Sequence, residues 1–151
     1  MKYNTTFYHS PIGVLFLKAN SYALLELQLC DEQKEATDTV SPILKETIRQ
    51  LTEYFEGKRQ TFELPLRPKG TAFQQKVWDA LCKIPYGTTT SYAGLAGSIG
   101  LPKAYRAVGN ANGKNPIAII IPCHRVVASD GSLGGYAYGL TIKEALLRLE
   151  R

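Results

Sequence analysis

The stretch SYAGLAGSIGLPKAYRAVGNANG, residues 91–113, decides how the second half of the chain folds. Ser91 is a good N-cap for a short helix over 92–99, and the glycine that follows is a good residue to end it. Pro102 then predicts the start of a second helix that runs to about Asn112. Two short helices joined by a glycine-containing turn form a helix-turn-helix.

The second of these helices has little side-chain bulk. Its small residues are Ala104, Ala107, Gly109, Ala111 and Gly113. Arg106 is its one long cation, and Lys103 stands at its start. Such a helix can approach a surface closely and project one arginine toward it. A helix packed tightly inside a compact core has the same composition, and composition alone favours neither interpretation.

A longer helix precedes this motif. Thr71 and Gln74 stand at the spacing of a capping box, and apolar residues continue at helical intervals to Leu81. The sequence PYG at 85–87 ends that helix, and residues 64–70, with two prolines and a glycine, predict an extended linker before it.

The first third of the chain predicts a small sheet and one helix. Three β-rich runs, at 3–8, 13–18 and 23–29, are separated by turn residues. Ser41 followed by a proline then predicts the start of a helix that ends before Gly57. The fold class is therefore α+β. An N-terminal α/β domain, with a small antiparallel sheet and a helix, spans 1–65. A C-terminal helical domain with a winged helix-turn-helix spans 66–151.

Length and composition exclude several classes of protein. The chain has 151 residues, 44% of them hydrophobic and 21% charged, values that argue against intrinsic disorder, a fibrous protein and a disulfide scaffold. The net charge is +5, and it is unevenly distributed. Residues 67–125 carry eight basic side chains and one acid. This is the pattern of a surface that faces phosphates, although a solvated basic face without a partner has it too.

Neither a membrane segment nor a metal site is expected. The longest apolar run, 117–121, is far too short to span a bilayer, and the N-terminus has no targeting pattern. The three cysteines are odd in number and widely spaced, without the spacing of zinc ligands. We therefore expect a cytoplasmic protein that needs no metal or other cofactor and does not bind membranes.

The chemistry is expected just after the apolar run 117–121, which predicts a buried strand or core segment. Pro122 fixes the backbone there, and Cys123 follows beside His124 and Arg125. An imidazole and a cation both favour the thiolate, the nucleophilic form of cysteine. Because neighbouring residues of an extended segment point to opposite sides, the histidine is expected to act through a water or a turn. A buried structural cysteine is the alternative, and it is the interpretation that we apply to Cys30 and Cys82.

The sequence around Cys123 resembles the active-site signature of the O6-alkylguanine-DNA alkyltransferases, also called methylated-DNA–protein-cysteine methyltransferases. The matching motifs, in the family's order and spacing, are Ser91-Tyr92, Arg106-Ala107-Val108-Gly109, Asn115-Pro116, residues 121–127, Gly134-Gly135-Tyr136 and residues 146–150. The resemblance is specific over 71–150 and looser over the first 65 residues. It implies DNA repair by direct damage reversal: a base is flipped out of the duplex, and its alkyl group is transferred irreversibly, once per protein molecule, to the cysteine. The donor is O6-alkylguanine, with O4-alkylthymine as a further candidate.

The resemblance implies a role for each matching catalytic residue. Cys123 matches the alkyl acceptor, and His124 and Glu150 match the partners of a relay that includes a water. Asn115 matches the residue that ties the helix-turn-helix to the active-site segment. Tyr92 matches the residue that crowds the target phosphate and donates a hydrogen bond to the lesion base.

The resemblance also implies a monomer that binds double-stranded DNA through the minor groove. Arg106 matches the finger that fills the space left by the flipped nucleotide. The other expected DNA contacts are Tyr92, Lys103, Ala107, Gly109, Arg125 and Ser129. The substrate pocket is expected to use the carbonyls of Cys123 and Val126 and the wall residues Tyr136, Ala137 and Tyr138. Alanine and tyrosine replace the family's usual serine and glycine at the last two positions, so the range of alkyl groups is left open.

Three other functions compete with this one. A non-catalytic module that binds alkylated DNA is the main alternative, but its members replace the cysteine of this signature. A helix-turn-helix transcription regulator would leave Cys123 incidental. A thiol hydrolase that uses Cys123 and His124 would turn over many times.

Overall fold

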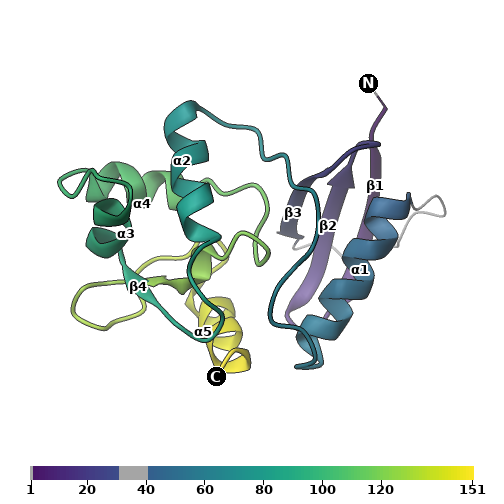
Figure 1. The fold of residues 1–151 in the computed structure, drawn as a ribbon. Coiled ribbons are helices and arrows are strands. Elements are labelled where there is room, and N and C mark those ends of the chain that lie inside the picture. The colour runs from purple at the N-terminus through teal and green to yellow at the C-terminus, as the bar shows by residue number, and fades with distance from the viewer. Residues whose placement is uncertain (1, 31–40) are drawn as a thin grey trace. The chain divides into compact units, whose positions relative to one another are not determined.

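The computed structural model describes residues 2–30 and 41–151, and the chain divides into two compact units (Figure 1). The N-terminal unit extends to Lys69 and includes Pro116–Ala118, whereas the C-terminal unit consists of Gly70–Asn115 and Ile119–Arg151. The sequence predicted one division of the chain, after residue 65. It did not predict that residues 116–118 belong to the N-terminal unit. We propose that the domain boundary lies within the linker 64–70, where the N-terminal unit ends at Lys69.

The N-terminal unit contains a three-stranded antiparallel sheet in the order β1-β2-β3, formed by Asn4–Ser10, Gly13–Ala19 and Leu24–Cys30. The ends of the three predicted β-rich runs therefore lie within two residues of the ends of the observed strands. Asn20 shapes the second turn, because its side-chain oxygen accepts hydrogen bonds from the amides of Tyr22 and Ala23, both at 2.8 Å.

Helix α1, Pro42–Phe55, packs on this sheet (Figure 1). Ser41 caps it as expected, with its hydroxyl accepting from the Leu44 amide at 3.3 Å, and the chain leaves the helix through Gly57 at φ 74°. The fully buried side chains of the helix and the sheet form one core: Leu15, Leu17, Leu24, Leu27, Leu44, Leu51 and Tyr54.

A distant segment of the chain adds to the edge of β3. The Leu27 amide donates to the Pro116 carbonyl, and the Ala118 amide donates to the Leu27 carbonyl, both at 2.9 Å. The apolar run 117–121 is buried as expected, but apart from one bridge at Ile117 it does not form a strand. Pairing cannot continue because the backbone at Ile119 turns to φ 71°, a conformation that a β-branched residue rarely adopts.

The C-terminal unit begins with α2, Ala72–Leu81, and the predicted capping box is present. The Thr71 amide donates to Gln74 Oε1 at 2.9 Å, and the Gln74 amide donates to Thr71 Oγ1 at 3.1 Å. Trp78 links this helix to a segment more than 30 residues later in the same unit. Its buried indole nitrogen donates to the Ala111 carbonyl at 2.8 Å.

The helix-turn-helix consists of α3, Tyr92–Ser98, and α4, Tyr105–Gly113. Ser91 caps α3 by accepting from the Gly94 amide at 2.9 Å, as expected. The expected start of the second helix at Pro102 is wrong. The Ala104 amide donates to the Leu101 carbonyl at 2.9 Å, which closes a turn with the proline in its second position. Proline's fixed φ suits that position of a turn as well as it suits the first turn of a helix.

The remaining elements are short and lie around the end of the apolar run. A 3-10 turn, η1, covers Cys123–Arg125, and β5, Val126–Val127, pairs in parallel with β4, Thr90–Ser91. Helix α5, Leu140–Leu149, ends the chain. The fold is therefore α+β. No helix in the described part of the chain has both the length and the apolar character needed to cross a membrane.

Candidate active site

Cys123 lines a cavity of about 200 Å³ inside the C-terminal unit. The walls come from α3, α4, η1 and the loop before α5, and the lining residues are Tyr92, Gly109, Asn112, Gly113, Asn115, Cys123, Gly135, Tyr136, Ala137 and Tyr138. Six residues expected to act in catalysis or in the substrate pocket therefore meet in one cavity, together with Gly109 of the expected DNA surface. They are Tyr92, Asn115, Cys123, Tyr136, Ala137 and Tyr138.

Two asparagines from the end of α4 hold the cysteine turn in place. Asn115 Nδ2 donates to the Ile121 carbonyl at 2.7 Å, and Asn112 Nδ2 makes a longer contact, 3.4 Å, with the Cys123 carbonyl. Pro122 precedes the turn, and the Arg125 amide closes it on the Pro122 carbonyl at 3.0 Å. The helix-turn-helix and the reactive segment are therefore one hydrogen-bonded structure.

Burial raises the pKa of the Cys123 thiol above its ordinary value, because a thiolate loses its hydration in the cavity. Asn115, the charge of Lys143 and the hydroxyl of Tyr136 act in the opposite direction and favour the thiolate. The resting side chain is therefore a thiol at neutral pH. Its neighbours make deprotonation less costly during the reaction. The groups that favour the thiolate here include Asn115, Lys143 and Tyr136, whereas His124 and Arg125 were expected to do so.

His124 and Glu150 are both buried and lie 2.7 Å apart, from Nε2 to Oε2. Burial lowers the pKa of His124, so that the imidazole is neutral at neutral pH. The other ring nitrogen, Nδ1, is buried and has no hydrogen-bond partner among the described residues. A buried nitrogen of this kind is a ready position for a bridging water or a transferred proton.

Arg125 does not lie on the surface that we expected to contact DNA. It is 7% exposed, and its guanidinium donates to both oxygens of Glu150 and to the Ile84 carbonyl. Its donors are therefore engaged inside the protein, and a phosphate cannot reach them. The prediction of a DNA contact at Arg125 is corrected to a buried ion pair that orients Glu150.

Sequence reasoning missed Lys143, a fully buried residue of α5. Its ammonium group donates to the carbonyls of Val126 at 2.6 Å and Gly135 at 2.9 Å, and also to that of Leu133. These carbonyls belong to the two segments that flank the cavity. The spacing could have indicated it, because Lys143, Leu146 and Glu150 recur at three and four residues, which places them on one buried helix face.

The wall of the cavity depends on close approach to the Tyr92 ring. A Cβ atom at Gly109 would lie 3.6 Å from that ring, and one at Gly134 would lie 3.3 Å from it. Tyr136 and Tyr138 also line the cavity and stand edge to face, with ring centroids 5.6 Å apart. Val126, whose carbonyl was expected to read the base, is buried, and that carbonyl accepts from Lys143.

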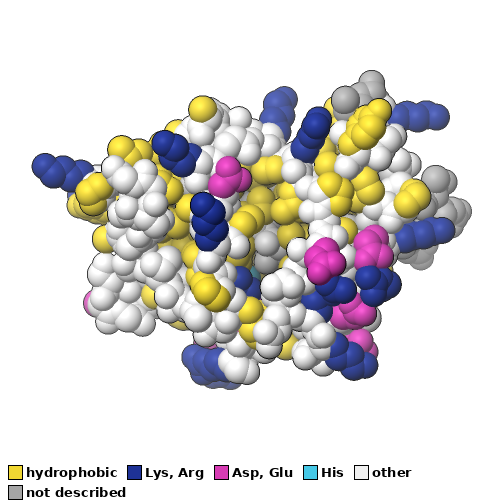
Figure 2. Space-filling view, in the orientation of Figure 1, with side chains coloured by type: hydrophobic (Ala, Val, Ile, Leu, Met, Phe, Trp, Pro, Cys, Tyr) yellow, Lys and Arg dark blue, Asp and Glu magenta, His cyan; other side chains and the backbone are white. Residues whose placement is uncertain are grey.

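The residues expected to contact DNA, apart from Arg125 and the cavity residues, are on the surface. Lys103, Arg106, Ala107 and Ser129 are all exposed. The charge pattern also differs between the units. Arg49 pairs with Glu46 and Glu53 on α1, and Figure 2 shows acidic and basic side chains side by side over that helix. Basic side chains predominate around α2 in the same view.

The other two cysteines differ from the buried structural residues that we expected. Cys30, at the end of β3, is half-buried, and Cys82, just after α2, is exposed. Cys123 alone of the three is buried and lines a cavity. Within residues 2–30 and 41–151, no group of three histidine, cysteine, aspartate or glutamate side chains is arranged to hold a metal ion.

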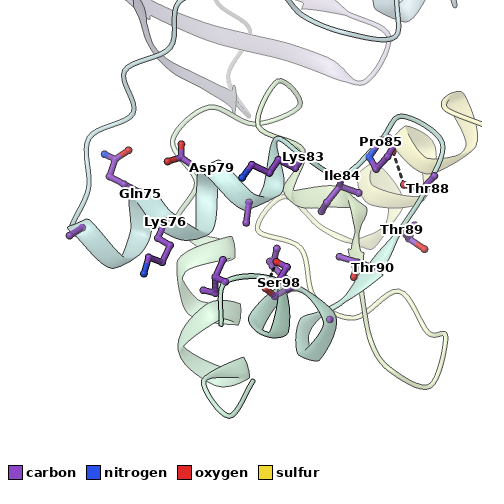
Figure 3. A pocket seen from close by; sticks show the side chains of 15 residues that line it. Gln75, Lys76, Asp79, Lys83, Ile84, Pro85, Thr88, Thr89, Thr90 and Ser98 are labelled. Carbon is purple, nitrogen blue, oxygen red and sulfur yellow. Dashed lines mark hydrogen bonds between the residues drawn. The ribbon is translucent and has the colours of Figure 1, made fainter. Parts of the chain in front are cut away.

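A larger open groove of about 830 Å³ lies between α2, α3 and the segment before β4 (Figure 3). Figure 3 shows Gln75, Lys76, Asp79 and Lys83 along α2, with Thr88, Thr89 and Thr90 at the other end. It shares no lining residue with the cysteine cavity and has no nucleophile comparable to a buried thiol. We therefore place the reaction in the smaller cavity.

Comparison with known proteins identifies the family. Residues 72–151 match the model of the 6-O-methylguanine DNA methyltransferase DNA-binding domain, and residues 3–68 match that of its ribonuclease-like domain. A methylated-DNA–protein-cysteine methyltransferase of Methanosarcina barkeri is 53% identical, with 93% of this chain and 92% of that protein aligned. The constitutive enzyme of the same name from Bacillus subtilis is 46% identical, over 100% of this chain and 96% of its own.

Solved structures agree with these matches. The crystal structure of Mycobacterium tuberculosis O6-methylguanine methyltransferase has a TM-score of 0.86 and 42% identity, and covers 99% of this chain and 93% of its own. A structure of the M. tuberculosis protein in complex with DNA has a TM-score of 0.86 and 46% identity, with coverage of 98% and 91%. Both halves of the chain, their fold and the buried cysteine site therefore lead to the same conclusion: the chain belongs to the 6-O-methylguanine DNA methyltransferase family.

Proposed function

We propose that this chain repairs DNA by direct damage reversal, with Cys123 as the acceptor of the alkyl group from O6-alkylguanine. It is a methyltransferase, and DNA is its partner. The assignment of Cys123 rests on its buried thiol, which lines a cavity of about 200 Å³. The next residue, His124, is neutral, and its Nδ1 atom has no hydrogen-bond partner among the described residues. The volume of the cavity is below the 300–1,000 Å³ typical of sites for drug-sized ligands and suits one flipped base.

The reaction begins with extrusion of the damaged nucleotide, because a base inside the duplex cannot reach the cavity. The sulfur of Cys123 attacks the alkyl carbon, and a carbon–sulfur bond forms as the bond between that carbon and the guanine oxygen breaks. The electron pair of the broken bond stays on guanine, and Tyr92 donates a proton to the ring and regains one from solvent. The products are guanine and a thioether, which water does not cleave, so each molecule acts once.

The thiol proton leaves through His124. Its unpartnered Nδ1 is the acceptor, reached through a water, and Glu150 on the opposite nitrogen stabilises the imidazolium that forms. Arg125 holds Glu150 by two hydrogen bonds, so it acts as a positioning residue. Asn115 and Lys143 favour the thiolate and fix the segments on either side of it.

Exposed residues of α4 and the turn before it supply the DNA contacts. Arg106 occupies the space of the flipped nucleotide, Lys103 contacts a phosphate, and the small residues Ala107 and Gly109 allow close approach to the minor groove. Ser129 adds a contact beyond η1. The protein acts as a monomer in the cytoplasm.

A test by mass spectrometry follows from the assignment. The protein is incubated with duplex DNA that carries O6-methylguanine, and its intact mass and peptide map are recorded. We expect one added methyl group on Cys123 and none on Cys30 or Cys82, and no modification of a Cys123→Ser variant.

Other outcomes would contradict the proposal in distinct ways. Tight binding of the damaged duplex without modification would favour the non-catalytic module. Repeated turnover would exclude the single-use thioether. A methyl group on exposed Cys82 would move the chemistry away from the cavity.

A further inference from the structure

Two large apolar side chains are exposed at the turn that joins α3 to α4. Leu101 is 41% exposed and Tyr105 is 47% exposed. The other large hydrophobic side chains exposed in the described residues, Tyr3, Tyr22 and Leu140, lie on separate segments. Isolated apolar residues are common on protein surfaces, whereas a group of them marks a site of interaction. We call Leu101 and Tyr105 the apolar edge.

The backbone holds the apolar edge outward. The Leu101 amide donates to the Ala96 carbonyl at 3.0 Å, and the Ala104 amide donates to the Leu101 carbonyl at 2.9 Å. The turn is therefore closed on both sides. Val108 and Ala111 provide the buried face of α4, so the core of this unit is completed without Tyr105.

Tyr105 also lies on the face of α4 that leads to the cysteine cavity. Gly109 and Asn112 line that cavity, and they follow Tyr105 by four and seven residues. Helix positions separated by four and seven residues share a face. The exposed aromatic ring is therefore continuous with the site, one turn beyond its rim.

The charges around the apolar edge favour DNA over a protein partner. Lys103 lies between its two members and Arg106 follows directly, and both are exposed. No acidic residue occurs from 80 to 129. A duplex satisfies both kinds of side chain, because its phosphates pair with the cations and its sugars and base edges accept apolar groups in the minor groove.

We propose that the apolar edge is a DNA contact in its own right: Tyr105 and Leu101 pack against sugars and base edges of the minor groove beside the flipped nucleotide. The tyrosine acts as an uncharged wedge next to Arg106 and keeps the duplex open at the lesion. This inference rests on the proposed function and adds two recognition residues to it.

The test separates an apolar contact from an electrostatic one. Binding of a duplex with O6-methylguanine is measured over a series of salt concentrations for Tyr105→Ala, Leu101→Ser and Lys103→Ala. We expect the tyrosine variant to bind roughly 10-fold more weakly at every salt concentration, the size of one lost aromatic contact, with an unchanged salt slope. The lysine variant should instead lose about 0.9 from the slope, the value for one phosphate contact.

Transfer rates and a matched aromatic variant complete the test. Tyr105→Ala should slow alkyl transfer from the duplex but not from free O6-benzylguanine, and Tyr105→Phe should restore the duplex rate. Tyr22→Ala, which removes an exposed tyrosine of the N-terminal unit, is the control and should match the wild type.

Two results would overturn the inference. They are wild-type binding and transfer by Tyr105→Ala, and equal losses on the duplex and on the free base. If the wild-type protein fails to transfer the methyl group, the proposed function itself is wrong. If the wild type transfers it and Tyr105→Ala behaves like the wild type, only this inference is wrong.

Discussion

Arg125 donates two hydrogen bonds to Glu150, from Nε to Oε1 at 2.8 Å and from Nη2 to Oε2 at 3.1 Å. The same Oε2 atom lies 2.7 Å from His124 Nε2. One buried carboxylate therefore links the arginine to the imidazole, and the orientation of the ring depends on a residue two positions from the reactive cysteine. This chain of contacts makes Arg125 a positioning residue.

Replacing Arg125 by methionine should lower both stability and reactivity. The change leaves Glu150 buried without its cation, and breaking a buried ion pair costs about 3–5 kcal/mol of unfolding free energy. Transfer should slow equally from duplex DNA and from free O6-benzylguanine, because the relay serves both. Urea unfolding and single-turnover rates provide the two measurements, with Lys76→Met, an exposed position on α2, as the control. A loss of transfer rate on duplex DNA alone would contradict the positioning role and would favour a contact between Arg125 and a phosphate.

The rate of alkyl transfer from free O6-benzylguanine to Cys123 should rise with pH from neutral into the alkaline range. Burial raises the pKa of Cys123, so the reactive thiolate becomes more abundant as the pH increases. Lys143→Met removes a positive charge that lowers this pKa, and the variant's rate profile should move to higher pH. If the rate profiles of the variant and the wild type superimpose, the ammonium group of Lys143 does not affect the pKa of Cys123 and serves only to bind the three backbone carbonyls.

His124 should make the protein less stable in acid. Its pKa is lowered by burial, so below its ordinary value of about 6.5 the unfolded chain binds a proton that the folded chain resists. The unfolding free energy therefore falls as the pH falls, by at most about 1.4 kcal/mol per pH unit for one proton. Unfolding in urea between neutral and acidic pH should show this slope in the wild type and a shallower one in His124→Gln. His9→Gln changes the other, exposed histidine and should keep the wild-type slope.

Local signals in the sequence were sufficient for much of the fold. Ser41, Thr71 and Ser91 were expected to cap helices and do so, because a cap is a contact between residues three apart. Pro102 was misplaced because one fixed φ suits both a turn and a helix start. The segment 116–118 joins β3 through pairing between residues about 90 positions apart, which no local pattern encodes.

The site was predicted unevenly for a related reason. Cys123, Tyr92 and Tyr136 lie in motifs and meet in the cavity as expected. Arg125 was assigned to the DNA surface on the resemblance to the family, and only the position of Glu150 at the end of α5 reveals its partner. Lys143 was missed because its partners are three backbone carbonyls, which no residue type in the sequence identifies. Only its spacing from Leu146 and Glu150 indicated that it lies on a buried helix face.

Arg106→Ala should slow transfer from duplex DNA far more than transfer from free O6-benzylguanine. The side chain is exposed on the first turn of α4, where it can replace the flipped nucleotide in the stack, and a free base needs no such replacement. We expect a loss of at least about 10-fold on the duplex, since extrusion of a base costs a few kcal/mol. Single-turnover rates on the two substrates test this, and equal losses would contradict the finger role.

Tyr138 should limit the size of the alkyl group. Its ring packs edge to face on Tyr136 and closes one wall of the cavity of about 200 Å³. Tyr138→Gly removes that wall, so the ratio of the rate with O6-benzylguanine to the rate with O6-methylguanine should increase, by roughly 10-fold if the space gained accommodates most of the added phenyl ring. Tyr138→Phe retains the ring and should keep the wild-type ratio. If the glycine and phenylalanine variants have the same ratio, the size of the alkyl group is controlled elsewhere, and the Tyr92 side of the cavity is the next position to change.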